Sequence, residues 1–256
     1  MSMLQIHEMT HYFGGLRAVH NFNLCIEPGQ IKGLIGPNGA GKSTIFNLIS
    51  GIYTPTKGRI TLNDEHITGL PPHKIASLGI GRTFQNLCLW RHMTVLEHVK
   101  MAHYSRITYG LIGAFFGTAQ RHREEALIEE RAFTLLRLLR IDHLADQVVT
   151  NLPYGGQRRV EIARALAMNP KVLFLDEPTA GMNPDELRQM IEIIRKIHQE
   201  FDLALYIIEH RLRVVMELCQ KIQTLVFGEV IAEGTPEEIQ CNPHVIEAYL
   251  GKEMFG

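Results

Sequence analysis

Nine consecutive residues near the N-terminus, Gly36 to Thr44, have the types and spacing of a phosphate-binding loop. They read GPNGAGKST and fit the pattern G-x-x-x-x-G-K-[ST] in full. In such a loop the backbone N–H groups turn toward the phosphates, and the N-terminus of the following helix adds positive potential. We expect Lys42 to neutralise the β- and γ-phosphates of a nucleotide, and Ser43 to give an oxygen to Mg²⁺. The predicted nucleotide-binding residues of this stretch are Gly36, Pro37, Asn38, Gly39, Ala40, Gly41, Lys42, Ser43 and Thr44.

Two consecutive carboxylates, Asp176 and Glu177, follow an apolar run that is typical of a buried strand. At the end of that strand, Asp176 is expected to reach the metal, directly or through water. Glu177 is expected to point the other way, toward the γ-phosphate, where a carboxylate can orient or deprotonate the attacking water. Acidic residues can also simply solvate a strand end. The phosphate loop upstream favours the catalytic interpretation.

The elements that must position these groups alternate between strands and helices. A short apolar strand over 31–35 enters the phosphate loop, and a helical run over 44–49 leaves it. Apolar stretches over 172–176 and 203–208 lack alternation, which is typical of parallel strands buried on both faces. Strands separated by helices predict βαβ units around a parallel sheet.

The helix between the last two strands has a well-marked start. Asn183 is the expected N-cap, Pro184 fits the first helical position, and Glu186 stands where a capping box has its acid. One face then repeats apolar residues at helical spacing. The predicted buried stripe is Leu187, Met190, Ile191, Ile194 and Ile197.

The beginning and the middle of the chain differ from this pattern. Residues 4–9, 22–26 and 59–63 read as strands, and Gly14-Gly15 marks a turn between the first two. From about Gln85 to Leu144 the apolar residues recur at helical spacing instead. Within that part, residues 104–120 fit neither period, and we expect an irregular insertion there.

Composition limits the classes of function. The 256 residues suffice for one large domain, or one domain with a subdomain, and the formal net charge of −1 gives no support for nucleic-acid binding. Four widely separated cysteines predict reduced thiols in a cytoplasmic protein rather than disulfides or a zinc site. The longest apolar-leaning run, over 107–119, is shorter than the about 20 residues of a membrane-spanning helix. We therefore expect a soluble chain whose membrane role, if it has one, comes through a partner. The cysteines are Cys25, Cys88, Cys219 and Cys241.

The order GPNGAGKST, YGGQRR, LFLDEP and a lone His210 after the last strand resembles the cassette of ABC-type ATPases. The resemblance extends from Leu4 to about Gly234 and implies ATP as the nucleotide. The implied fold is α/β: a P-loop NTPase core with a mixed or parallel sheet, an N-terminal antiparallel β part and an inserted helical subdomain. In this single cassette the core is expected over about 1–85 and 168–235, the helical subdomain over 86–167, and a C-terminal tail over 236–256.

The resemblance also assigns roles to single residues. Gln85, in RTFQ, is similar to the loop glutamine that links the metal site to the helical subdomain, and His210, in IIEH, to the histidine that contacts the γ-phosphate. An aromatic residue from an early loop stacks on the base in such cassettes. Phe13 fits by its place before the glycine pair, with Tyr12 as the neighbouring candidate and a core aromatic as the alternative.

The segment that gives this family its signature is expected at Tyr154, Gly155, Gly156 and Gln157, at the start of a helix. In the family it serves the nucleotide of a second cassette, so two cassettes packed head to tail are implied. Tyr154 stands where the family usually has a serine, and Asn183 where a following loop commonly ends in aspartate. The glycine N–H groups and the positive helix end, which bind the phosphate, are kept.

Further segments resemble one branch of the family, the longer ATP-binding subunit of branched-chain amino-acid uptake systems. They are GRTFQ at 81–85, MTVLE at 93–97, IEHR at 208–211 and AYLG at 248–251. The implied partners are a second cassette, either identical or a paralogue, a transmembrane permease and, indirectly, a substrate-binding protein. The implied location is the cytoplasmic face of the membrane, peripheral through the permease.

Other classes of ATPase share parts of these motifs. Urea or amide importers and a lipopolysaccharide-export ATPase share parts of the pattern, and a soluble ATPase of iron–sulfur assembly has the same motifs. An ATPase acting on nucleic acid usually has a long coiled coil or two cassettes in one chain, and this chain has neither. The candidate permease-docking residues, which could equally be subdomain core, are Leu87, Leu89, Trp90 and Met93.

Overall fold

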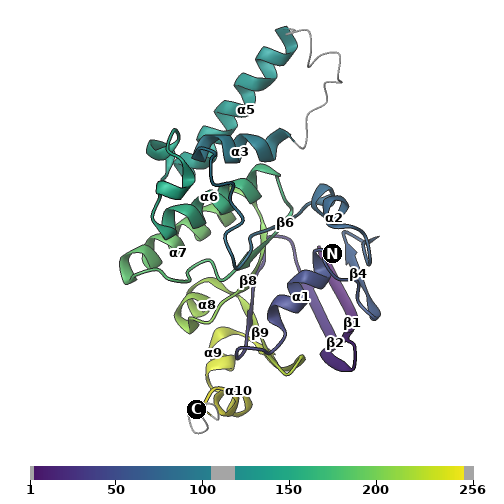
Figure 1. The fold of residues 1–256 in the computed structure, drawn as a ribbon. Helices are drawn as coiled ribbons and strands as arrows, with labels where there is room; N and C mark the ends of the chain where they lie inside the picture. Colours follow the sequence, from purple (N-terminus) through teal and green to yellow (C-terminus); the bar gives the residue numbers. More distant parts are fainter. Residues whose placement is uncertain (1–2, 105–118, 251–256) are drawn as a thin grey trace.

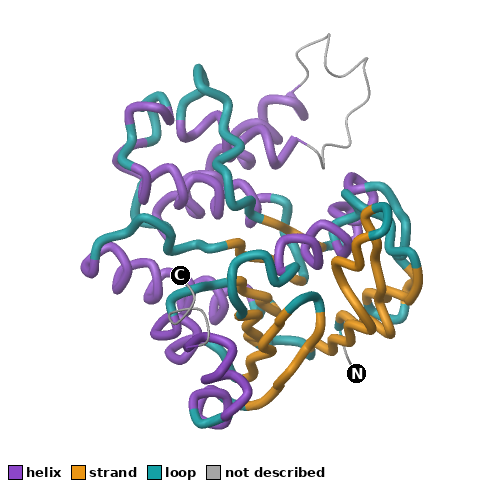
Figure 2. Tube along the Cα trace, turned by 60° about the horizontal axis from the view of Figure 1, so that its bottom comes forward, coloured by secondary structure: helices purple, strands orange, loops and turns teal. Residues whose placement is uncertain are grey.

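The computed structural model describes residues 3–104 and 119–250 (Figure 1). Most of the expected irregular insertion, 105–118, lies outside the described residues, as do the last six residues of the expected tail. The strands form two sheets, one of six strands and one of four. In Figure 2 the strands gather on one side of the molecule and most of the helices on the other.

The six-stranded sheet carries the segments that were expected to do chemistry. Its order is β10-β9-β3-β8-β7-β6, and β9, β3, β8, β7 and β6 run parallel while β10 is antiparallel to β9. Leu34 of β3 pairs with Ile208 of β8, which pairs in turn with Asp176 of β7. The chain therefore leaves these three strands at one common edge. The bounds are β3 Ile31–Ile35, β6 Ile80–Arg82, β7 Val172–Asp176, β8 Ala204–Ile208, β9 Lys221–Val226 and β10 Glu229–Gly234.

The four-stranded sheet is antiparallel, in the order β2-β1-β4-β5. Its first two strands are longer than predicted, because their pairing continues through register shifts beyond Met9 up to Phe13 opposite Leu16. The outer residues of this hairpin are mostly exposed, so they lack the apolar pattern from which strands are predicted. The bounds are β1 Leu4–Phe13, β2 Leu16–Ile26, β4 Lys57–Leu62 and β5 Glu65–His66.

Helices fill the interval between β6 and β7. They are α3 (Val95–Tyr104), α5 (Ala119–Leu138) and α6 (Tyr154–Ala167), and in Figure 1 they gather at the end of the molecule farthest from α10. The expected tail forms two short helices, α9 (Pro236–Gln240) and α10 (Pro243–Leu250). The remaining helices are α1 Lys42–Ile49, α2 Pro72–Leu78, α7 Pro184–Phe201 and α8 Leu212–Leu218, with 3₁₀ turns at Asp142–Leu144 and Val149–Asn151.

The core lies on both faces of the large sheet, as the apolar strands predicted. Alternate residues of β7 belong to different clusters: Phe174 packs with Phe46 of α1, with ring centroids 4.8 Å apart, whereas Leu173 and Leu175 pack on the side of α7. The predicted stripe of α7 is buried, and the capping box of Asn183 and Glu186 is present. Core packing and helix capping therefore hold the βα units close to the edge where the strands end.

Two properties of the whole chain complete the fold. All four cysteines are free thiols, and Cys219 alone among them is buried. None of the helices in residues 3–104 and 119–250 combines the length and apolarity needed to cross a bilayer.

Candidate functional site

The phosphate-binding loop joins β3 to α1 at the common strand edge. The helix begins at Lys42, two residues earlier than predicted, with Gly41 as its N-cap in the left-handed conformation. The Lys42 side chain is buried, and its Nζ donates to the carbonyl oxygens of Gly36 at 2.7 Å and Pro37 at 2.9 Å. Ser43, in the first turn of α1, is exposed. The loop therefore curls around the lysine ammonium, while the predicted metal-binding hydroxyl faces outward.

Glycines are required in this loop by close packing. A Cβ added at Gly36 would lie 2.1 Å from the backbone oxygen of Leu225 in β9, and one at Gly41 would lie 2.8 Å from the backbone oxygen of Ala18 in β2. Both distances are far below a normal van der Waals contact. The loop is thus wedged between the two sheets, which holds its N–H groups in place for a phosphate.

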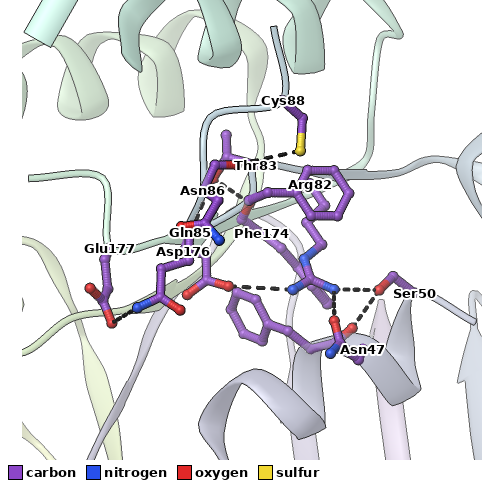
Figure 3. A network of polar contacts seen from close by, with 12 residues as sticks. Asn47, Ser50, Arg82, Thr83, Gln85, Asn86, Cys88, Phe174, Asp176 and Glu177 are labelled. Carbon is purple, nitrogen blue, oxygen red and sulfur yellow. Dashed lines mark hydrogen bonds and ion pairs between the residues drawn. The ribbon is translucent and has the colours of Figure 1, made fainter. Parts of the chain in front are cut away.

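Asp176 ends β7 beside the loop that follows β6, as Figure 3 shows. Its side chain is almost fully buried, and its Oδ2 lies 3.3 Å from Nη2 of Arg82. Arg82 is itself held by Asn47 Oδ1 at 2.7 Å and Ser50 Oγ at 2.8 Å, both on or next to α1. Burial raises the pKa of Asp176 above its ordinary value, and the guanidinium of Arg82 opposes this shift. The ion pair therefore favours the carboxylate form in a buried position.

The other oxygen of the same carboxylate fits a magnesium ligand. Asp176 Oδ1 is buried and accepts no hydrogen bond from any described residue. A buried carboxylate oxygen without a partner is costly, and Mg²⁺ prefers oxygen ligands of this kind. Asp176 therefore has one oxygen committed to the fold and one left for a cation.

The other two predicted catalytic residues contact the same side-chain oxygen of Glu177. Its Oε1 accepts from Gln85 Nε2 at 3.3 Å and lies 2.5 Å from Nε2 of His210 (Figure 3 shows the Gln85 contact). The three come from the ends of β6, β7 and β8, which the sheet register brings to the same edge. The structure thus brings together the residues that were predicted to be catalytic. It also leaves the Glu177 side chain partly exposed, at 13%.

The backbone at Glu177 and the residue before His210 explain this convergence. Glu177 has φ of 49°, in the left-handed region that non-glycine residues seldom adopt, and its N–H donates to the Ile208 oxygen at 2.9 Å. The buried Glu209 accepts from Thr179 Oγ1 at 2.5 Å and from the N–H of His210 at 3.2 Å. Glu209 therefore joins the loop after β7 to the loop after β8. Sequence reasoning passed over it, although a glutamate directly after an apolar strand was the available signal.

Phe13 lies at the tip of the β1–β2 hairpin. Its ring packs edge-on against His11, with centroids 4.6 Å apart, and against Tyr53 at 5.2 Å. The side chains of Phe13 and Tyr12 are both 42% exposed, so neither is a core residue. The alternative of a core aromatic is thereby wrong, and Phe13 stays the predicted base-stacking residue.

The predicted signature segment begins α6, with Pro153 as its N-cap. Tyr154 is exposed, and its hydroxyl accepts from Arg158 Nη2 at 3.0 Å. Gln157 donates its amide to the Leu152 oxygen at 2.9 Å, within the same chain. The glycine pair 155–156 lies in the first helical turn, as expected. The contacts of this segment with a second chain stay a prediction.

The C-terminal helix also reaches this edge, which no motif had indicated. A cavity of ≈ 260 Å³ is lined by residues of α10, of the phosphate loop and by His210. Burial raises the pKa of the Tyr249 hydroxyl, which faces the backbone of Gly36. The lining residues are Gly36, Pro37, Asn38, His210, Ala248 and Tyr249.

Comparisons with known proteins agree with this geometry. Residues 19–180 match the family profile of ABC transporters, and residues 229–254 match that of the branched-chain amino acid ATP-binding cassette transporters. The chain is 42% identical over 250 residues to the high-affinity branched-chain amino acid transport ATP-binding protein LivG of Escherichia coli, covering 98% of each chain.

Solved structures give the same result. The ADP conformation of MJ1267, an ATP-binding cassette of an ABC transporter, superposes with a TM-score of 0.85 at 31% identity, covering 98% of this chain and 99% of that one. The dimeric bacterial ABC transporter cassette MJ0796 has a TM-score of 0.78 at 26% identity, covering 91% and 99%. The predicted fold class is thus confirmed, and the chain belongs to the ABC transporter family as one of its ATP-hydrolysing cassettes.

Proposed function

We propose that this chain hydrolyses ATP at an interface with a second cassette, and that it thereby powers the import of branched-chain amino acids through a membrane permease. The observation that carries the proposal is the meeting of Gln85 and His210 at one oxygen of Glu177. This meeting occurs at the sheet edge where the phosphate loop also begins. A base, an amide and an imidazole beside a phosphate site are the groups that orient and deprotonate a water.

In the proposed mechanism the loop over 36–44 and Lys42 bind the phosphates, and Phe13 stacks on the base. Mg²⁺ would be held by Asp176 and Ser43, with the side-chain oxygen of Gln85 as a further ligand, and when bound it would neutralise phosphate charge. Glu177 takes the proton of the attacking water at Oε2, because Gln85 and His210 both contact Oε1. His210, 2.5 Å from Oε1, keeps the carboxylate aimed at the nucleotide and contacts the γ-phosphate.

The second cassette would complete the site. The first turn of α6, with Tyr154, Gly155, Gly156 and Gln157, presents a helix N-terminus that attracts anions. The resemblance to a dimeric cassette supports an arrangement in which this turn meets the neighbour's γ-phosphate. ATP then holds two cassettes together, and hydrolysis releases them.

The permease would dock beside Gln85. A cavity of ≈ 350 Å³ lies between the core and the helical part, and Phe84, Trp90 and Met101 are among its mostly apolar lining residues. Trp90 is 50% exposed, whereas Leu89 packs against the core, so only part of the predicted docking set is available to a partner. An apolar groove one residue from Gln85 supports peripheral attachment on the cytoplasmic face through a permease helix.

The decisive experiment on hydrolysis is Glu177→Gln in the full chain. We expect turnover to fall by about 10²-fold or more, because a general base contributes that much. ATP binding and ATP-driven dimerisation should persist. Glu192→Gln on the exposed part of α7 is the matched control. Unimpaired turnover of Glu177→Gln would remove Glu177 from the catalytic role.

The transported substrate is tested in liposomes that hold the permease, with the binding protein added. The C-terminal family match over 229–254 and the LivG relative support leucine, isoleucine and valine as substrates. We expect these amino acids to stimulate ATP hydrolysis, while urea and short amides do not. Stimulation by urea or an amide alone would contradict the proposed substrate and leave the ATPase assignment intact.

A further inference from the structure

The second turn of α6 contains a fully buried arginine, Arg158, which lies in the segment YGGQRR but has no role in nucleotide binding assigned to it. Its Nη1 donates to the Phe84 oxygen at 2.5 Å, and its Nη2 donates to the Gln85 oxygen at 2.9 Å. The same Nη2 donates to the Tyr154 hydroxyl at 3.0 Å. One guanidinium therefore contacts both the loop that carries Gln85 and the first residue of α6.

Glu161, one turn further along α6, holds the arginine and the loop together. Its Oε2 lies 2.6 Å from Arg158 Nη1, and its Oε1 accepts from the N–H of Phe84 at 3.0 Å. Both side chains are 0% exposed. The backbone around Phe84 and Gln85 is thus bonded at three points by one buried pair. Only arginine offers a planar fork that can reach two carbonyls and a carboxylate at once.

This pair joins two parts of the proposed machinery that lie in different segments. The side chain of Gln85 donates to Glu177 Oε1, the atom that His210 also contacts. A hydrogen-bonded path therefore runs from Tyr154 through Arg158 and Gln85 to Glu177. Tyr154 belongs to the turn that would meet the neighbour's nucleotide, and Glu177 serves the chain's own.

We propose that Arg158, braced by Glu161, is a positioning residue that sets Gln85 against Glu177 according to where the first turn of α6 lies. The inference rests on the proposed function, because it needs hydrolysis at Glu177 and a partner at Tyr154. When that turn engages the partner's nucleotide, Arg158 transmits its position to the Gln85 backbone. The two ATP sites of a dimer are then coupled within each chain. A purely structural pair would stabilise α6 without affecting Gln85.

The test replaces the pair as a unit, because Arg158→Met alone would leave the Glu161 charge buried without a partner. For Arg158→Met/Glu161→Leu we expect kcat to fall by about 10-fold to 10²-fold, the loss that a misplaced catalytic group causes. The KM for ATP should stay within about 2-fold, since the phosphate loop is untouched. Arg159→Met, the neighbouring arginine that bonds to Gln189, is the matched control and should keep the wild-type kcat.

A double-mutant cycle with Gln85→Ala separates positioning from structure. If Arg158 acts through Gln85, the paired substitution should change kcat by less than about 2-fold in the Gln85→Ala background. An equal loss in both backgrounds would overturn the inference, and so would wild-type kcat in the paired variant. Absence of hydrolysis in the unmodified chain would instead contradict the proposed function.

Tyr154→Phe gives a second route that leaves the buried pair in place, should the paired variant fail to fold. Removal of the hydroxyl breaks the hydrogen bond that Arg158 Nη2 donates to Tyr154 and leaves the bonds of Arg158 to the Gln85 loop in place. We expect a smaller loss of kcat, about 3-fold to 10-fold, that also disappears in the Gln85→Ala background. A loss that adds fully to that of Gln85→Ala would contradict the path through Arg158.

Discussion

The strand edge and the start of α6 hold phosphate-handling residues by different means. At the strand edge, backbone pairing of β3, β8 and β7 fixes where Gly36, Glu177 and His210 emerge. At the start of α6, the position of Tyr154 relative to Gln85 depends on side-chain bonds to Arg158. Replacing one side chain does not change the register of a sheet, but it can remove a polar bridge between a helix and a loop. The comparison teaches that backbone pairing fixes most of the strand edge, whereas side chains that a single substitution can remove tie the start of α6 to the Gln85 loop.

The largest expected effect comes from breaking the buried bridge on one side. Glu161→Ala leaves the Arg158 guanidinium buried without its partner, so we expect the free energy of unfolding to fall by about 3–5 kcal/mol. Arg213→Ala removes another helical ion pair, with Glu217, whose arginine is mostly exposed. That change should cost less than about 1 kcal/mol. Denaturant titration of both variants checks the difference, and equal losses would mean that burial of the bridge is unimportant.

The next effect separates the two regions by the nucleotide they serve. Lys42→Ala removes the buried ammonium of the phosphate loop, and we expect the affinity for ATP to fall by about 10²-fold or more. Tyr154→Ala should leave the affinity of the single chain within about 2-fold, because that turn serves the neighbour. Nucleotide titration at protein concentrations too low for dimerisation makes the comparison. A large loss with Tyr154→Ala would show that the start of α6 contacts its own nucleotide.

A pH effect on stability is expected from a buried histidine of the helical part. His98 of α3 is buried, bonds through Nε2 to the Trp90 N–H at 2.9 Å, and contacts the Thr94 oxygen through Nδ1 at 2.8 Å. Burial lowers the pKa of His98 below its ordinary value of 6.5, with a smaller opposing contribution from the Thr94 bond. The unfolded chain therefore binds more protons than the folded chain between the folded-state pKa of His98 and about pH 6.5.

Stability should consequently fall as the pH drops from about 6.5 toward the folded-state pKa of His98, by at most about 1.4 kcal/mol per pH unit. His98→Gln should flatten this dependence, whereas substitution of the exposed His143 by glutamine should leave it as in wild type. Unfolding free energies measured between about pH 7.5 and about pH 5 provide the test. Identical slopes for wild type and His98→Gln would rule out this origin of acid sensitivity.

The smallest expected effect concerns the loop that leaves the strand edge toward α7. Asn183 accepts from the N–H groups of Asp185 and Glu186, both at 3.0 Å. Asn183→Ala should lower the free energy of unfolding by about 1 kcal/mol, the usual cost of a lost N-cap. Asn183→Asp should retain the cap and serves as the control. If the alanine variant also reduces kcat more than about 3-fold, the cap positions the Glu177 loop as well as α7.

The sequence predicted the strand edge well because local patterns specify it. The full phosphate-loop motif and the apolar runs before Glu177 and His210 each place a residue at the end of a strand, and parallel pairing does the rest. The bridge of Arg158 and Glu161 was missed, since a charged pair on a helix usually faces solvent and its burial depends on packing against a loop more than 70 residues away. The contact of α10 with the phosphate loop was also missed, because it too depends on packing between segments that lie far apart in the sequence.

Because of the backbone oxygen of Ala18, the cassette cannot be shortened at its N-terminus without changing the surroundings of the phosphate loop. This oxygen would lie 2.8 Å from a Cβ atom added at Gly41, so β2 of the antiparallel sheet forms one wall of the phosphate loop. A fragment that starts at β3 would keep every residue of the nucleotide motif and lose the wall that shapes it. In a scaffold without this hairpin, only the left-handed backbone at Gly41 would still favour glycine at that position.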